Sequence, residues 1–395
     1  MKKYYPYLIT VSHMINDSCQ SILPALLPLF IYTYGLSLEQ AGFLILSNTA
    51  LSSLLQPLLG YLSDKINQPR LIALGVLLSA CSTGVMGFVT SYESLLVCAT
   101  LAGVGSSIFH PEGAKIMNRL GGGKKGKAMG TFAIGGSSGF AIGPLFAGSI
   151  AYTVGPHGLA AFTVVGLIIS TILFILMPRI VAHARTIDQA VATENPTLVD
   201  KPLKNYWKYF GILFVIILSQ SVNFRVINAF IPIFWTRELG TSPEQGSFAL
   251  TVFFSIGIFM TYIGGLLGDK YGPIKIIRLS LLIWLPAMFL LTEVPTFSPV
   301  IMMPVAYLLL LMIGAAKAIS YSPVIVLGQT YLAKSIGFAS GITLGVSQTI
   351  GGIIAPVVGN LADTYTLPAA MMTLVPFLVV GLGASLILKD PKKLN

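Results

Sequence analysis

The fold is decided by one stretch of the chain, Gly103-Val-Gly-Ser-Ser-Ile-Phe-His-Pro-Glu-Gly-Ala-Lys115, a basic turn from Arg119 to Lys127, and Gly135-Gly-Ser-Ser-Gly-Phe-Ala-Ile-Gly-Pro-Leu-Phe-Ala-Gly148. Two apolar segments meet at this turn. The first carries ionisable groups in apolar surroundings, and the second carries glycines at a spacing that allows close helix contact. This combination predicts two helices of a membrane protein with moving parts rather than the core of a soluble domain.

The composition also favours a membrane protein. Of the 395 residues, 54% are hydrophobic and 10% are charged, whereas roughly 25% are charged in an ordinary soluble domain. Apolar runs of about 20 residues, the length that crosses a bilayer, recur along the whole chain. A water-soluble fold could not bury this much apolar surface.

The basic residues behind the net charge of +10 are distributed unevenly between the two sides of the predicted membrane spans. With the spans given below, 20 of the 24 lysines and arginines lie in the termini or in loops on the side of the N-terminus. Arg237 lies on the opposite side, and three cations lie inside helices. By the positive-inside rule, both termini are cytoplasmic. No basic stripe alternates with stacking aromatics, so we expect no nucleic-acid partner.

The cysteines and the N-terminus add little. The three cysteines lie in apolar spans, where a thiol acts as a small packing residue, and we assign them no redox or metal role. Only Lys2 and Lys3 precede a long first span that has no clear cleavage site, so we do not expect a cleaved signal peptide.

The hydropathy pattern predicts twelve helices in two sets of six. The expected spans are 6–34, 40–63, 70–90, 93–118, 127–153, 158–178, 207–236, 244–268, 273–293, 299–323, 335–361 and 366–388. A six-helix bundle over 1–178, a polar cytoplasmic linker over 179–206 and a second bundle over 207–395 follow from this division.

Matching residues at a nearly constant offset indicate that the two sets are related. Six matches occur in order: Pro28 with Pro232, Glu39-Gln40 with Glu244-Gln245, Gly60-x-x-x-Asp64-Lys65 with Gly265-x-x-x-Asp269-Lys270, Pro111 with Pro323, Gly139 with Gly351, and Pro144 with Pro356. The offset is 204 or 205 for the first three and 212 for the others. We therefore predict an all-α integral membrane fold of two pseudo-symmetric six-helix bundles.

With these features the chain resembles the major facilitator superfamily of secondary transporters over essentially its full length. Within that superfamily, Ser12-His13-Met-Ile-Asn16-Asp17, Phe109-His110-Pro111-Glu112 and the glycine run of the fifth helix look like the fosmidomycin-resistance branch of drug-efflux proteins. The resemblance implies a transporter that works by alternating access.

Asp17 is the first candidate for proton coupling. It lies about eleven residues, or roughly 16 Å, into the first helix and hence near the middle of a bilayer, where a carboxylate is costly unless it has a partner or exchanges a proton. His13 lies one turn earlier on the same face, and Asn16 and Gln20 form an adjoining strip suited to substrate binding. The alternative is a cluster that only holds helices together.

The fourth helix carries His110, Glu112, Lys115 and Arg119 toward its cytoplasmic end. We rank Glu112 ahead of His110 as a proton carrier, because burial disfavours a charged imidazole. Glu112 and Lys115 are three residues apart and can meet across one turn. The alternative role for that pair is to anchor the helix at a gate.

The seventh helix carries candidate substrate-binding residues, namely Gln220, Asn223, Arg225 and Asn228. Arg225 stays protonated and needs an acidic partner, an anionic substrate or water. The resemblance implies that it faces Asp17 across a central cavity; a permanent pair that locks the halves is the alternative. Lys317 on the tenth helix is a weaker candidate, placed among gating residues, and could reach the interface instead.

Gly139, Gly143, Pro144 and Gly148 on the fifth helix look like the family's antiporter motif. Small residues one turn apart let a neighbouring helix approach, and the proline bends the helix. Ordinary helix packing is the alternative. In the matching helix, Ala355 and Asn360 replace Gly143 and Gly148.

The resemblance makes Asp64 and Asp269, followed by Lys65 and Lys270, conformational latches at cytoplasmic hairpins, since helix N-termini favour negative charge. The first hairpin departs from the family pattern with Asn67-Gln68-Pro69. The fourth helix also lacks the arginine common in proton antiporters; Ala99 and Leu101 stand at the plausible positions.

From the sequence we expect a monomeric bacterial cytoplasmic-membrane antiporter that uses the proton gradient, needs no cofactor or metal, and exports small amphipathic or anionic compounds. A proton symporter or facilitator that imports a metabolite is the nearest alternative. An enzyme is not expected, because no Walker A sequence, metal-ligand spacing or Gly-x-Ser-x-Gly elbow is present. A receptor that does not transport is a further alternative. The sequence does not name the substrate.

Overall fold

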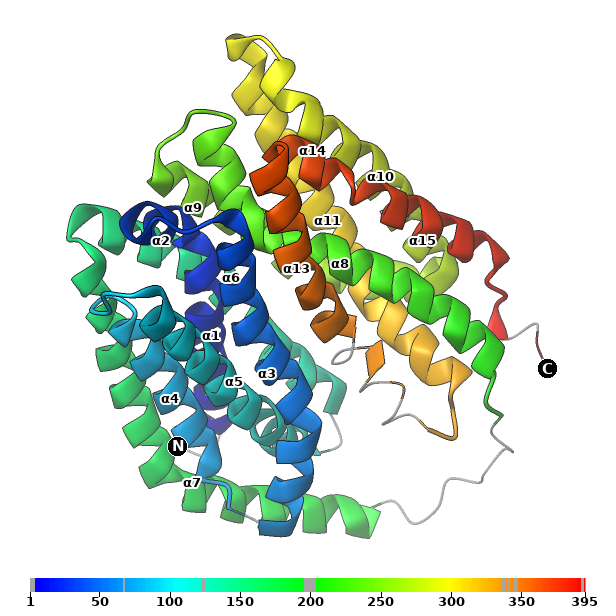
Figure 1. Ribbon diagram of the computed structural model, residues 1–395. Helices are drawn as coiled ribbons and strands as arrows, with labels where there is room; N and C mark the ends of the chain where they lie inside the picture. Colours follow the sequence, from blue (N-terminus) through cyan, green and yellow to red (C-terminus); the bar gives the residue numbers. More distant parts are fainter. Residues whose placement is uncertain are drawn as a thin grey trace. The chain divides into compact units, whose positions relative to one another are not determined.

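The computed structural model describes residues 4–66, 68–122, 125–194, 204–335, 339, 342–343, 347–391 and 394, without the side chains of 51, 54, 56–57, 59–66, 125–127, 190–194 and 347–348. Its named elements are helices throughout (Figure 1). Residue contacts divide the chain into two compact units. The first unit comprises 1–23 and 47–201, and the second comprises 24–46 and 202–395.

Helices are found at all twelve expected positions, and residues 336–338, 340–341 and 344–346 of the predicted eleventh span lie outside the described residues. The first six spans correspond to α1 (Tyr5–Ala25) with α2 (Leu27–Tyr34), α3 (Leu38–Ile66), α4 (Leu71–Val85), α5 (Tyr92–Leu120), α6 (Lys125–Thr153) and α7 (Ala160–Glu194). The other six correspond to α8 (Trp207–Arg237), α9 (Pro243–Tyr271), α10 (Pro273–Glu293), α11 (Pro299–Tyr331), α13 (Ser347–Thr364), and α14 (Leu367–Met372) with α15 (Val375–Ile387). In the described residues the only strand-like pairing is an isolated bridge between Asn205 and Leu332.

The first span is broken rather than continuous. The axes of α1 and α2 differ by 47°, with Pro24 inside α1 and Pro28 in the first turn of α2. Proline removes a backbone donor and clashes with the preceding turn, which explains the bend. The bend also lies where the chain passes from the first unit to the second.

The sixth span is longer than the sequence predicts. Residues 179–194 belong to α7, so the expected linker over 179–206 is helical for its first part, and Pro178 lies inside the helix. Ile180 and Ala184 are buried in the core of the first unit, and Arg119 on α5 forms an ion pair of 2.8 Å with Asp188. These contacts stabilise a segment whose polar residues had predicted a loop.

Two other spans differ at their ends. The tenth span continues to Tyr331, eight residues beyond the predicted end. The twelfth is interrupted between α14 and α15, just before Pro376 in the first turn of α15. The N-termini of α5 and α9 are capped by their own sequence: Ser91 and Ser242 each form a capping box that satisfies the first amide groups.

Most of these helices can cross a membrane. Among the described residues, eight helices are long and apolar enough to do so, and the bent pair of α1 and α2 makes a ninth. Large apolar side chains are exposed along them, for example Ile175 on α7 and Val380 on α15. Such surfaces are stable against lipid and not against water.

Candidate functional site

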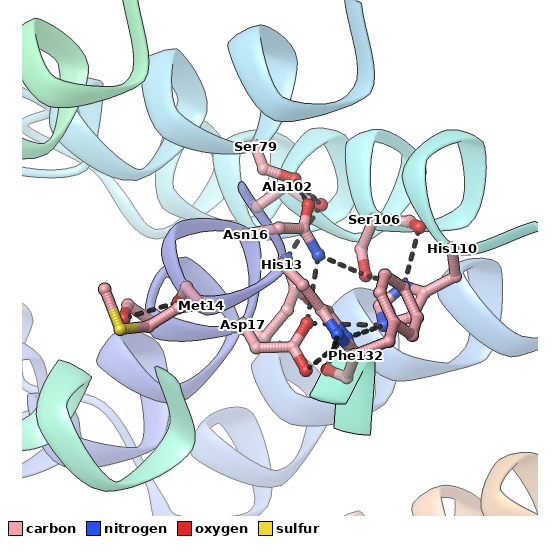
Figure 2. A network of polar contacts seen from close by, with 11 residues as sticks. His13, Met14, Asn16, Asp17, Ser79, Ala102, Ser106, His110 and Phe132 are labelled. Carbon is pink, nitrogen blue, oxygen red and sulfur yellow. Dashed lines mark hydrogen bonds and ion pairs between the residues drawn. The ribbon is translucent and has the colours of Figure 1, made fainter. Parts of the chain in front are cut away.

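Asp17 lies in the first unit between two histidines. Its Oδ2 is 3.2 Å from Nε2 of His13, one turn earlier on α1. Its Oδ1 is 3.3 Å from Nε2 of His110 on α5. The two Nε2 atoms are themselves 3.3 Å apart, and Figure 2 shows the three side chains pointing toward one another. Asp17 is only 5% exposed, so the cluster is largely shielded from solvent.

Backbone carbonyls fix which nitrogen of each ring faces the carboxylate. Nδ1 of His13 is 2.7 Å from the Phe132 carbonyl oxygen, and Nδ1 of His110 is 2.9 Å from that of Ser106. A carbonyl oxygen can only accept, so each Nδ1–H donates. Both Nε2 atoms then meet the carboxylate, and they are acceptors when the rings are neutral. The cluster therefore needs bound protons, and adding or removing one changes which contacts are satisfied.

Asn16 supports this cluster from the side. Its Nδ2 donates to Asp17 Oδ1 at 3.0 Å and to Ser106 Oγ at 3.3 Å, while its Oδ1 accepts from Ser79 Oγ on α4 at 3.1 Å. Asn16 is fully buried. The network joins α1, α4 and α5 (Figure 2), so the amide holds the carboxylate in place. Its predicted contact with substrate stays a prediction.

The glycine run of α6 packs directly on α1. A Cβ built on Gly139 would collide with the Met14 carbonyl oxygen, and one on Gly136 would meet the side chains of Asp17 and His13. Phe132, also on α6, stacks on the His13 ring at a centroid distance of 3.9 Å. Only glycine allows the α6 backbone this close to the acidic cluster.

The other sequence candidates of the first unit lie apart from the ion pairs of Asp17. Glu112 and Lys115 are on α5, buried and half-buried respectively. Within the described part of the chain, the ionisable side chains paired with Asp17 are the two histidines. The structure places His110 against Asp17, and the ranking of Glu112 ahead of His110 as a proton carrier stays a prediction. Gln20 donates to the Ala102 carbonyl oxygen at 3.0 Å. Gly143, Pro144 and Gly148 are buried on α6.

The second unit has a cationic cluster instead. Nζ of Lys317 on α11 lies 4.4 Å from the ring centroid of Phe224 and 5.3 Å from that of Tyr321. Cζ of Arg225 lies 5.6 Å from the Phe224 ring. No acidic side chain within the described ranges pairs with either cation, and Nε of Arg225 is buried without a hydrogen-bond partner. Aromatic faces stabilise these cations only in part.

A small cavity of about 50 Å³ adjoins Lys317. Polar groups on its wall include Gln220, Ser320 and Thr343. Gln220 donates to Ser280 Oγ at 3.5 Å and accepts from Ser320 Oγ at 3.4 Å. This part of the second unit offers a positive charge, hydroxyl groups and an amide to a bound group.

Two other candidates on α8 lie inside the second unit. Asn223 is fully buried and donates to the carbonyl oxygens of Ser219 and Leu374. Asn228 is 3% exposed, and its Oδ1 is buried without a partner. The structure gives Asn223 a helix-packing role, while substrate contacts for both residues stay a prediction, as does the facing of Asp17 and Arg225.

The two units share a pattern of hydrogen bonds between their helices, but they differ in the ionisable residues beside it. Asn16 bonds Ser79 of the third span and Ser106 of the fourth, and Gln220 bonds Ser280 of the ninth and Ser320 of the tenth. Gln220 follows Asn16 at the repeat offset of 204. At the same offset, however, Ser221 stands where Asp17 stands, so the second unit has no carboxylate at this position.

Of the four predicted latch residues, the structure describes the side chains of only Asp269 and Lys270. The backbone of Asp64 and Lys65 belongs to α3, but their side chains lie outside the described residues. Asp269 and Lys270 are exposed at the C-terminal end of α9, and Nζ of Lys270 lies 5.0 Å from the Tyr271 ring centroid. Their latch function therefore stays a prediction.

The sequence did not predict several residues of these two clusters. Ser79, Ser106 and Phe132 complete the acidic cluster, and Phe224 with Tyr321 completes the cationic one. One signal was available: Ser106 and His110 are one turn apart on a helix. The ring of Phe132 and the serine of α4 come from other helices, and no spacing indicates them.

The chain has two sets of apolar helices related by a repeat. It also has a buried acidic cluster in the first unit and a half-buried cationic cluster in the second. These features are typical of a membrane transporter. A family model described as Major Facilitator Superfamily matches residues 9–356 and, in a second match, 213–395. The chain belongs to the major facilitator superfamily and has its fold of twelve membrane-spanning helices in two six-helix bundles.

Relatives and solved structures agree with this family. The chain is 30% identical to the uncharacterized MFS-type transporter YfnC of Bacillus subtilis (strain 168), over 98% of this chain and 94% of the relative. It is 29% identical to the fosmidomycin resistance protein of Escherichia coli (strain K12), over 90% and 85%. A solved bacterial homolog of the human lysosomal transporter Spinster superposes with a TM-score of 0.77 at 17% identity, covering 98% and 96%.

Proposed function

We propose that this protein is a proton-driven antiporter of the bacterial cytoplasmic membrane that exports small amphipathic or anionic compounds, with fosmidomycin-like antibiotics among them. The observation that carries the proposal is Asp17, a buried carboxylate held between the Nε2 atoms of two imidazoles. The similarity to the fosmidomycin resistance protein supports export, and membership of a transporter family supports transport rather than enzyme activity.

In this proposal the first unit carries the proton. Each Nδ1–H is already donated to a carbonyl oxygen, so protons come and go at the two Nε2 atoms and the carboxylate. Gaining a proton turns a contact between two acceptors into a hydrogen bond; losing it restores repulsion. His13 and Asp17 lie on α1, whereas His110 lies on α5. Protonation thus changes how strongly two helices are held together, as coupling of a proton to a conformational change requires.

The second unit binds the substrate. Arg225 and Lys317 attract an anionic group, and Gln220 offers an amide at the adjoining cavity. The aromatic faces of Phe224 and Tyr321 suit the apolar part of an amphipathic compound. One half of the molecule rocks against the other to expose the bound compound to alternate sides, with both termini in the cytoplasm and a single chain sufficient.

The test uses purified protein in vesicles with an imposed pH gradient. Export predicts that substrate accumulates in inside-out vesicles acidified inside, that collapsing the gradient abolishes accumulation, and that Asp17→Asn does the same. His157→Gln is the matched control, since His157 is an exposed histidine of the same unit. Transport that survives both gradient collapse and Asp17→Asn contradicts the proposal. Cells with and without the protein, challenged with a panel of antibiotics that includes fosmidomycin, identify the compound.

A proton symporter or facilitator that imports a metabolite is the second candidate. It is favoured by the similarity to the hexuronate transporter of Escherichia coli (strain K12), at 23% identity. The same vesicles separate the two. In an importer, substrate and protons move in one direction, so acidification outside right-side-out vesicles drives uptake.

A further inference from the structure

The atoms that bind protons in the first unit also have the arrangement of a transition-metal site. Within the described residues, one group of three metal-ligating side chains brings its ligand atoms within 4.8 Å of one another, namely His13, Asp17 and His110. We propose that these three residues bind a divalent transition-metal ion of the zinc class, and that the bound ion blocks proton exchange. The blocking part rests on the proposed function; the binding part does not.

Distances between the ligand atoms fit the ion. For tetrahedral Zn²⁺ with Zn–N bonds of about 2.0–2.1 Å, neighbouring ligand atoms are roughly 3.3 Å apart. The two Nε2 atoms are 3.3 Å apart, and each lies 3.2 or 3.3 Å from a carboxylate oxygen of Asp17. A small rotation of the carboxylate brings one or both of its oxygens to the ion.

The surroundings are those of a metal site as well. A metal-ligating histidine typically donates its other ring N–H to a carbonyl or carboxylate, which fixes the ring and its tautomer. Both histidines do so here, at 2.7 Å to Phe132 and 2.9 Å to Ser106. Asn16 donates to the ligating carboxylate at 3.0 Å. This second observation is independent of the clustering, because it concerns the nitrogens that face away from the cluster.

The types of ligand atom determine which metal ions the cluster prefers, and the exposure of His110 determines how an ion reaches it. Two imidazoles and one carboxylate suit Zn²⁺, Co²⁺, Ni²⁺ or Cu²⁺, whereas Mg²⁺ and Ca²⁺ require oxygen ligands. Three protein ligands leave a fourth position for water. The side chain of His110 is 28% exposed, so an ion can reach the cluster without the first unit unfolding. On binding, the ion takes the Nε2 lone pairs and releases the protons held there.

An ion at this position holds α1 and α5 together at three points and occupies both Nε2 atoms and at least one oxygen of the carboxylate. Metal binding and protonation compete for the same atoms, so a bound ion excludes the protons from them. A transporter with the ion bound is therefore expected to stop, and a chelator is expected to restart it.

The binding test uses the purified full-length protein and Co²⁺ alone as the probe. A tetrahedral Co²⁺ site gives visible absorption bands that are far more intense, and at longer wavelength, than the weak band of octahedral aqueous Co²⁺, and added Zn²⁺ should remove them. We expect one equivalent to bind, with affinity reduced about tenfold or more in Asp17→Asn and in His110→Gln. His157→Gln should bind as the unmodified protein does. Gel filtration and thermal unfolding without metal show whether each variant is folded.

Two outcomes overturn the proposal. One is the absence of tetrahedral bands in folded, unmodified protein; the other is binding that Asp17→Asn and His110→Gln leave unchanged. If a variant fails to fold, Asn16→Ala replaces it. It leaves all three ligands in place, removes the hydrogen bonds of Asn16 to Asp17, Ser79 and Ser106, and should weaken binding by a smaller factor. Zn²⁺ that binds at the site without slowing transport refutes the blocking role, and leaves the proton-driven function to its own test.

Discussion

Nε2 of His110 lies 3.3 Å from Oδ1 of Asp17, although the two residues are 93 positions apart on different helices. The contact connects α1 to α5, and it depends on the Ser106 carbonyl oxygen, which turns the His110 ring toward the carboxylate. Asp17 and His110 should therefore act as one functional unit rather than as two independent residues.

The first prediction concerns that unit. Asp17→Asn and His110→Gln should each lower gradient-driven transport by at least about tenfold, because each removes a charge-assisted hydrogen bond of about 1.5–3 kcal/mol. The double variant should be little worse than either single variant, so that the two effects fail to add. Initial transport rates in vesicles at a fixed pH gradient measure all three.

For comparison, the pair Asp17→Asn and His157→Gln should be additive, since His157 contacts Phe88 and not the cluster. If the effects of Asp17→Asn and His110→Gln multiply as independent ones do, the two residues do not share a proton.

The second prediction concerns the glycine face of α6. Gly139→Leu should lower the stability of the protein by about 1–3 kcal/mol, the usual cost of inserting atoms into a packed core, because its side chain meets the Met14 backbone. Gly130→Leu is the matched control on the same helix: a Cβ at Gly130 has no atom within 4 Å. Unfolding in a mixed detergent series compares the two variants.

A variant Gly139→Leu as stable as Gly130→Leu would mean that α6 does not need its close approach to α1. Gly139→Ala tests the same contact with a smaller group and should fall between the two in stability.

The third prediction concerns the cations of the second unit. Arg225→Gln and Lys317→Gln should each raise the KM for an anionic substrate about tenfold, since one charge-assisted hydrogen bond of 1.5–3 kcal/mol is lost, and should change the KM for a neutral substrate far less. Lys208→Gln is the control, because Lys208 is an exposed cation on the same helix as Arg225. Equal effects on charged and neutral substrates would indicate a structural role for both cations.

Much of this architecture is predictable from the sequence, for a physical reason. A bilayer requires long apolar helices, so hydropathy locates all twelve spans. It cannot show where a helix ends: Pro24 and Pro28 break the first span into two helices, whereas α7 continues as one helix past Pro178. The difference lies in tertiary contacts, since Ile180 and Ala184 are buried in the core and hold α7 helical beyond the proline.

The candidate site is predictable only where its residues share a helix. Spacing brings His13 to Asp17, since they are one turn apart on α1. Spacing along the sequence does not predict that His110 lies beside Asp17. From the general effect of burial on a charged imidazole, the sequence ranks Glu112 ahead of His110 as a proton carrier. The carbonyl oxygens that orient the rings, the stacking of Phe132 on His13 and the support from Asn16 all depend on helix packing, which a single sequence does not reveal.

The fourth prediction concerns the N-terminus of α3 in the second unit. Asp363 on α13 accepts the backbone N–H groups of Leu38 and Glu39, both at 2.9 Å, and Asn360 Nδ2 donates to Glu39 Oε2 at 2.9 Å. A carboxylate at a helix N-terminus satisfies free amides and complements the helix dipole. Asp363→Ala should therefore destabilise the protein by about 0.5–2 kcal/mol.

Asp363→Asn separates the two parts of that effect. The amide keeps one acceptor oxygen but loses the charge and the second acceptor, so its stability should lie between those of Asp363→Ala and the unmodified protein. Asn360→Ala removes the neighbouring hydrogen bond to Glu39 without touching the backbone amides, and should cost less than Asp363→Ala. Unfolding in the same detergent series gives the ranking. If Asp363→Ala is as stable as the unmodified protein, the amides of α3 are satisfied by water, and the contact between α13 and α3 contributes nothing to stability.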